Sequence, residues 1–272
     1  MLAILLSQIP DRLLSALLLQ TCKDFKLYVP SPDMLDHEGR LNFTRGGLTD
    51  VEEPLVCFLD ADSLPDKDFV RRILRTARRH PDFDVYHVNL AQGPDYPRKI
   101  KAAKLFRLVV QQGLPAPLPT FVFRTPRLKE KAVFRADHSL DPLPSILAAA
   151  SVRPVRNVWR QRLEWTAPAV SKDPVEEERQ IRQTLDFYRW SESFFGEEDY
   201  PLDTGERLAL YAHEVARLYP SYDPDSLKEI MNGFQAAQGT LRKVRAATAL
   251  KSAVKERQKE LTIHKEELPS GQ

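Results

Sequence analysis

Short apolar runs alternate with helical patterns over the first 165 residues, and this alternation restricts the possible folds more than any other feature of the sequence. The runs read as strands and cover residues 2–6, 25–29, 55–59, 84–90 and 121–123. Periodic apolar positions predict helices that begin near Asp11 and that cover 65–80, 99–112 and 141–150. Parallel strands need a crossover between them, and helices usually supply it, so we expect a largely parallel α/β sheet.

The sequence after residue 170 contains no strand pattern. Residues 166–173 (TAPAVSKD) read as a linker. Asp173-Pro174 followed by three glutamates is typical of a helix start, because an Asp cap, a proline and first-turn acids all favour that end. This helix is expected to reach Phe195, and further helices are expected near 204–218, 224–238 and 241–267. We therefore expect an α/β domain over 1–165 and an all-helical region over 171–272.

Composition excludes several classes of protein. A net charge of +2 is not the strongly basic balance of a nucleic-acid binder, so no nucleic-acid partner is expected. The two cysteines, Cys22 and Cys57, lack metal or redox spacing and point to a reducing compartment. No run reaches the roughly 18–20 apolar residues of a membrane-spanning helix. The apolar start of the chain lacks the basic segment of a signal peptide, so we expect it to be a strand and a helix of the mature fold.

Two carboxylates follow the clearest strand pattern, Leu55–Leu59. Asp60 and Asp62 are two residues apart, so in an extended segment they point to the same side. They stand where a strand ends, which is where open α/β sheets bind ligands. Two carboxylates at such a place form a hard oxygen site for Mg²⁺ or Mn²⁺, best completed by phosphate oxygens and water. The alternative is that Asp62 caps the next helix and Asp60 is a turn residue.

The segment VCFLDADSLPDKDFVRRIL, residues 56–74, resembles the core of family 2 glycosyltransferases. Three further segments resemble that family in the same order: residues 2–29 with Gln20-Thr21, residues 113–128, and residues 134–149. The resemblance covers about residues 1–165. It implies a GT-A-type fold, a Rossmann-like, mostly parallel sheet flanked by helices. It also implies transfer of a sugar from a nucleotide-diphosphate-sugar to an acceptor hydroxyl, with inversion at the anomeric carbon.

The resemblance assigns roles to individual positions. Asp60 and Asp62 match the carboxylates that hold the metal and the nucleotide diphosphate. Asp141 matches the aspartate that takes the proton of the acceptor hydroxyl; its alternative role is a helix cap before Pro142. Glu164 takes the place of a histidine near the metal.

Arginines and loop residues complete the expected site. Arg160 or Arg162 would hold diphosphate oxygens, unless both belong to a solvated strand face. Relatives carry an Asp-Asp pair after the second strand, where this sequence has Pro30-Ser31-Pro32-Asp33. Ser31 or Asp33 would then replace the carboxylate that grips the nucleotide base. This departure leaves open a catalytically decayed binding or scaffold protein whose helical C-terminal region mediates protein interactions.

The resemblance also implies a setting. Such relatives assemble bacterial surface glycans at the cytoplasmic side of the membrane and act on a glycan or lipid-linked acceptor. The basic stretch Lys99–Arg107 and the C-terminal run over 241–260 would allow peripheral contact with anionic lipid, although a solvated helix face is the alternative for both. The C-terminal helices could instead pair with a protein partner.

Overall fold

The computed structural model describes residues 1–6, 10–29, 48, 50–112, 115–131, 143–165, 174–196, 199–203, 206–207, 210 and 214. The chain separates into two compact units, residues 1–169 and residues 170–272. The boundary lies inside the segment 166–173 that the sequence marks as a linker. Each unit is described by itself.

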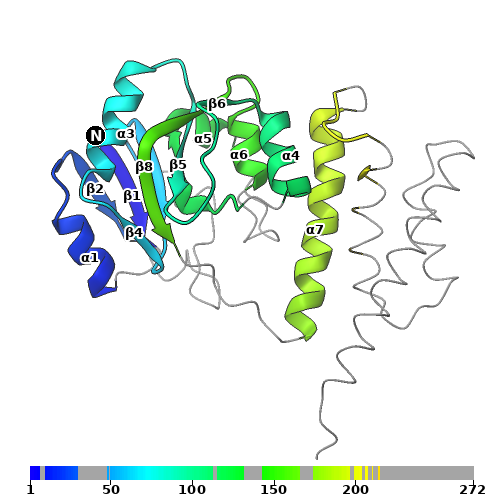
Figure 1. Cartoon of the computed structure of the whole chain (residues 1–272), viewed down its shortest axis with the longest axis horizontal. Coiled ribbons are helices and arrows are strands. Elements are labelled where there is room, and N and C mark those ends of the chain that lie inside the picture. Colours follow the sequence, from blue (N-terminus) through cyan, green and yellow to red (C-terminus); the bar gives the residue numbers. More distant parts are fainter. Residues whose placement is uncertain are drawn as a thin grey trace, which may run out of the picture. The chain divides into compact units, whose positions relative to one another are not determined.

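The first unit is built on a mixed, mostly parallel sheet (Figure 1). Its strands are β1 (Leu2–Leu6), β2 (Phe25–Tyr28), β3 (Leu55–Leu59), β4 (Ser63–Pro65), β5 (Val85–Leu90), β6 (Lys99–Ile100), β7 (Phe121–Arg124) and β8 (Val155–Trp165). They lie in the order β2-β1-β3-β7-β5-β8-β4, and β6 pairs with β8.

The directions of the strands show which edge of the sheet holds their carboxyl ends, where open α/β sheets bind ligands. β1 is parallel to β2 and β3, and β5 is parallel to β8. β7 is antiparallel to both β3 and β5, so β3 and β5 run the same way. The carboxyl ends of β1, β2, β3, β5 and β8 therefore reach the same edge of the sheet, which we call the carboxyl edge.

β1 and β3 are apolar throughout because both faces of each strand are buried. All ten of their residues are at most 6 % exposed. Leu2, Ile4 and Leu6 pack with Leu55, Cys57 and Leu59 in one core with apolar side chains of two helices, α1 (Asp11–Leu18) and α3 (Phe69–Arg79). A strand buried on both faces reads as a continuous apolar run, as the sequence does here.

Within the described residues of the first unit, the remaining helices are α4 (Ala102–Gln112), α5 (Thr125–Lys131) and α6 (Leu143–Ala149), with a 3₁₀ turn, η2 (Leu118–Thr120), before β7. The second unit contains α7 (Pro174–Phe195), whose bounds agree with the expected helix. The helices expected near 204–218, 224–238 and 241–267 lie almost entirely outside the described residues. Among the described helices, none has the length and apolar content that a membrane crossing requires.

Two predicted helices begin later than expected. The helix predicted over 65–80 begins at Phe69, because Ser63–Pro65 pairs with β8 as a strand instead. The helix predicted over 99–112 begins at Ala102, because Lys99-Ile100 pairs with the start of β8. Both errors have one cause: a short strand that pairs with a distant one leaves no local periodicity in the sequence.

Candidate functional site

The turn after β3 carries the two candidate carboxylates at the carboxyl edge. The Ser63 amide donates to the Asp60 carbonyl at 3.1 Å. The Ser63 hydroxyl donates to the Asp60 carboxylate, and the Asp60 amide donates to the same hydroxyl oxygen at 3.3 Å. These hydrogen bonds fix the orientation of the Asp60 side chain, which is half-buried. Asp62 is exposed, and no hydrogen bond or ion pair within the described part of the chain engages it.

Strand pairing brings Glu164 to the same place. β4 follows the turn directly and pairs antiparallel with the end of β8, with Leu64 opposite Glu164. The Glu164 carboxylate is exposed and lies 3.8 Å from the Arg12 guanidinium of α1. The sheet therefore brings Glu164 next to the turn, while its side chain is paired with a cation.

The donor atoms at the turn suit a hard divalent cation, but they do not complete its ligand shell. Among the described residues, no group of three or more His, Cys, Asp or Glu side chains could hold a metal ion. A cation bound by Asp60 and Asp62 would take its other ligands from phosphate oxygens and water, which is how Mg²⁺ usually binds beside a nucleotide. The two carboxylates therefore fit a metal that arrives with a diphosphate.

Arg162 binds the segment that follows β5. Its guanidinium donates to the carbonyls of Leu90 and Gly93 at 3.0 and 3.5 Å and forms an ion pair with Asp95 at 2.8 Å. This segment also lies at the carboxyl edge, because it follows the end of a parallel strand. Contact of Arg162 with a diphosphate stays a prediction, and in this structure the side chain orders residues 90–95.

Four predicted site residues have no described side chain. Ser31, Asp33 and Asp141 lie outside the described residues, and Asp141 precedes the first residue of α6 by two positions. Arg160 is part of β8, but its side chain is outside the described ones. Their roles stay predictions.

A clamp that the sequence analysis did not assign holds the segment beyond the turn. Gln20, which is 2 % exposed, donates to the Asp66 carbonyl at 2.6 Å and accepts from the Val70 amide at 3.1 Å. The Thr21 amide donates to the Lys67 carbonyl at 2.8 Å. The Gln20–Thr21 clamp thus ties the end of α1 to the start of α3. It satisfies an amide in the first turn of α3, which has no partner within that helix.

Thr21 also fixes a carboxylate beside the clamp. Its hydroxyl donates to Asp68 at 2.8 Å, and Arg71 pairs with the same carboxylate at 2.8 Å. The hydrogen bond from Thr21, followed by the charges of Arg71 and Arg72, lowers the pKa of Asp68 although burial opposes the change. The only sequence signal for this arrangement was the match of Gln20-Thr21 to the family resemblance.

Polar side chains also occupy the interior between β5 and β8. Asn157 donates to His87 at 3.4 Å and to Asn89 at 2.6 Å, and Asn89 donates to Asp95 at 2.8 Å. The pairing of β5 with β8 shifts register between His87 and Asn89. Burial lowers the pKa of His87 to about 3, so the imidazole is neutral. This hydrogen-bonded chain connects the sheet interior to the segment that Arg162 holds.

No family model matches the chain, and no curated protein matches it either. Among solved structures, the chain is similar to S. aureus TarS 1–349 in complex with UDP-GlcNAc, with 14 % identity and a TM-score of 0.53 over 93 % of this chain and 80 % of that one. It is also similar to S. aureus TarS 1–349 without a named ligand, with 14 % identity and a TM-score of 0.50 over 94 % and 81 % of the two chains. This likeness shows the fold, a GT-A-like sheet flanked by helices. The expected fold class is confirmed, and membership of family 2 stays a prediction.

Proposed function

We propose that this chain is a glycosyltransferase that moves a sugar from a nucleotide-diphosphate-sugar to an acceptor hydroxyl. The observation that carries the proposal is the Asp60-Ala61-Asp62 turn at the carboxyl end of β3 in a GT-A-like sheet. Ligands bind at the carboxyl ends of strands in open α/β sheets. A chain of similar fold, S. aureus TarS 1–349, is in complex with UDP-GlcNAc, which supports a UDP-sugar as the first donor to test.

The donor would bind through its diphosphate. Asp60 and Asp62 would hold Mg²⁺ or Mn²⁺ together with phosphate oxygens, and Glu164 would join them only after separating from Arg12. The cation supplies positive charge that stabilises the departing diphosphate. Ser63 keeps the Asp60 carboxylate in one orientation, so the turn does not have to be ordered when the donor binds. Arg160 or Arg162 would add charge-assisted hydrogen bonds to the diphosphate, and Ser31 or Asp33 would contact the nucleotide base.

The acceptor hydroxyl must lose its proton as it attacks the anomeric carbon. We assign that proton to Asp141, acting as general base. Attack opposite the leaving diphosphate in a single displacement inverts the anomeric centre. The acceptor would be a glycan or a lipid-linked glycan in the assembly of a bacterial surface polysaccharide, at the cytoplasmic side of the membrane and with peripheral contact to it.

Donor turnover tests this proposal. UDP release from UDP-GlcNAc would be followed with Mn²⁺ and with a chelator, with and without candidate acceptors. We expect release that needs the cation, that falls by at least about 100-fold in Asp62→Asn, and that falls similarly in Asp141→Asn once acceptor is present. Asp82→Asn is the matched control, because Asp82 is exposed and precedes the amino end of β5. Equal release by Asp62→Asn and by the unchanged protein would contradict the proposal.

A second candidate is a decayed glycosyltransferase-like binding or scaffold protein. Two observations favour it: residues 30–33 lack the expected Asp-Asp pair, and the Glu164 carboxylate is paired with Arg12. The C-terminal helical region over 171–272 would then mediate protein interactions. This candidate predicts a folded protein that binds no nucleotide, or that binds one without turning it over.

A further inference from the structure

A group of basic side chains meets at the edge of the sheet opposite the candidate site. Arg79 is the last residue of α3, and His80 follows it directly. Lys99 lies on β6 and Arg156 near the start of β8. We call these four residues the basic cluster. Its place at the amino ends of β5 and β8 separates it from the Asp60–Asp62 turn.

Three members of the basic cluster, His80, Lys99 and Arg156, lie close together, and Arg79 precedes His80 directly in the chain. Lys99 stands directly opposite Arg156 in the antiparallel pair of β6 and β8. Their charged groups lie 5.4 and 5.7 Å from the centre of the same Phe83 ring. The Arg156 guanidinium donates to Nε2 of His80 at 2.9 Å. Like charges directly opposite one another destabilise a strand pair, and the Phe83 ring attracts both cations but carries no net charge to neutralise them.

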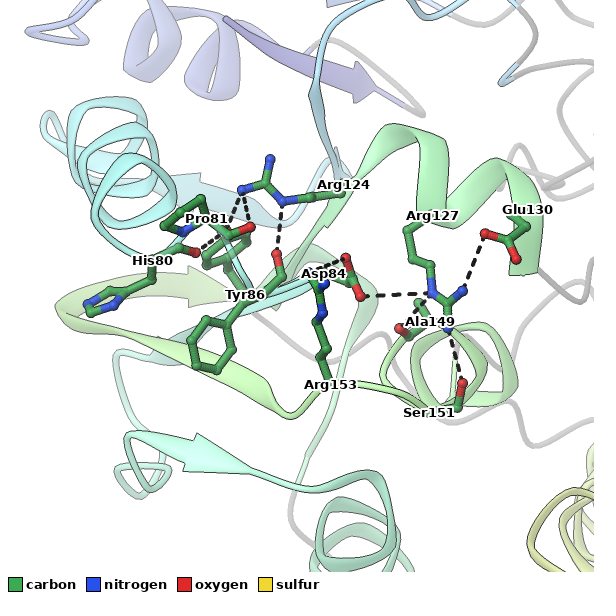
Figure 2. Close-up of polar contacts among 11 residues, drawn as sticks. His80, Pro81, Asp84, Tyr86, Arg124, Arg127, Glu130, Ala149, Ser151 and Arg153 are labelled. Carbon is green, nitrogen blue, oxygen red and sulfur yellow. Dashed lines mark hydrogen bonds and ion pairs between the residues drawn. The ribbon is translucent and has the colours of Figure 1, made fainter.

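No carboxylate of the described residues lies within ion-pair distance of these charges. None of the four side chains forms an ion pair with an Asp or Glu in the described part of the chain. Asp84, which follows Phe83 in the chain, pairs with Arg127 and Arg153, each at 3.9 Å (Figure 2). Nε of Arg156 is buried and has no hydrogen-bond partner. Burial and the charges of Arg156, Lys99 and Arg79 lower the pKa of His80, which agrees with an uncompensated positive field.

We propose that the basic cluster binds a phosphate group, carried by a soluble phosphate ester or by a lipid headgroup. Two arginines, a lysine and an imidazole gather positive charge and several donors at this edge of the sheet, and a tetrahedral oxyanion has enough acceptor oxygens to bind more than one of them. A monocarboxylate has a single charge and two oxygens, and would leave part of the repulsion in place. Phosphate binding at this edge is a property separate from sugar transfer and does not depend on it.

Calorimetric titration of inorganic phosphate into the full chain tests the proposal. A chelator is present so that no metal-held diphosphate site contributes, and chloride keeps the ionic strength constant. We expect saturable binding that weakens by about tenfold or more in Arg79→Gln/Lys99→Gln, because charge-assisted hydrogen bonds are lost. Lys67→Gln is the matched control, since it removes one exposed charge between β4 and α3, outside the cluster. Asp60→Asn/Asp62→Asn should bind phosphate normally, whatever the fate of the donor site.

Stability measurements separate binding from misfolding. Without phosphate, Lys99→Gln should unfold at the same temperature as the unchanged protein or a higher one, because it relieves repulsion from Arg156. With phosphate the unchanged protein should unfold at the higher temperature, because it binds the ligand more tightly and so gains more stability from it. Flotation with phosphatidylcholine vesicles, with and without phosphatidic acid, shows whether a headgroup is the source. Equal affinity of the double variant and the unchanged protein, or no binding to either phosphate or acidic vesicles, would overturn the proposal.

Discussion

Gln20 offers a sharp test of how the segment beyond the candidate turn is held in place. Gln20→Leu keeps the size of the side chain but removes its contacts with the carbonyls of Ala16 and Asp66 and with the Val70 amide. Each hydrogen bond contributes about 1 kcal/mol net, and a buried backbone group left without a partner costs somewhat more. We therefore expect the first unit to lose about 2–4 kcal/mol of unfolding free energy.

Urea unfolding measures that loss, and hydrogen exchange locates it. Exchange should accelerate in peptides that cover residues 66–79, because the clamp supplies the partner of an amide in the first turn of α3. Gln92→Leu is the matched control, since Gln92 is exposed in the segment after β5. A loss below about 0.5 kcal/mol, which is typical of surface substitutions, would refute the role assigned to the clamp.

Three further predictions concern other parts of the first unit. The folded-state pKa of His87, about 3, is below its ordinary value of 6.5, so between those values the unfolded chain binds the proton and stability falls as pH falls. His87→Phe should therefore escape about 2 kcal/mol of the loss that the unchanged protein suffers between pH 7 and pH 5 in urea titrations. Asp84→Asn should cost about 1–2 kcal/mol in the same assay at neutral pH, because Arg127 and Arg153 lose their charged partner (Figure 2). Arg162→Gln should speed hydrogen exchange in residues 90–96 and leave residues 85–88 unchanged; equal exchange would show that Arg162 does not order this segment.

The elements that the sequence predicted best are those whose signal is local. Leu2–Leu6 and Leu55–Leu59 are buried on both faces and read as continuous apolar runs. α7 begins at Pro174, as the sequence Asp173-Pro174 and the acids that follow indicate. The short strands β4 and β6 depend on pairing with β8, which lies far along the chain, so no local sequence pattern predicted them.

The candidate site likewise combines residues that a local pattern predicts with contacts that only the fold creates. Asp60 and Asp62 could be predicted as candidates because a strand end and two spaced carboxylates are both visible in the sequence. The clamp of Gln20 onto residues 66–70 could not be found in this way, because a buried amide that bridges two helices has no periodicity. The ion pair between Arg12 and Glu164 likewise joins residues that only the fold brings together.

Metal-dependent binding of a nucleotide diphosphate is the most direct test of the central claim. UDP, GDP and TDP would be titrated calorimetrically into the full chain, with Mn²⁺ and with a chelator, and into Asp60→Asn/Asp62→Asn and Asp82→Asn. The account predicts saturable binding of at least one nucleotide that requires both the cation and the two aspartates and that survives Asp82→Asn. Binding that persists in the chelator and in Asp60→Asn/Asp62→Asn, or no binding by a folded protein, would contradict it.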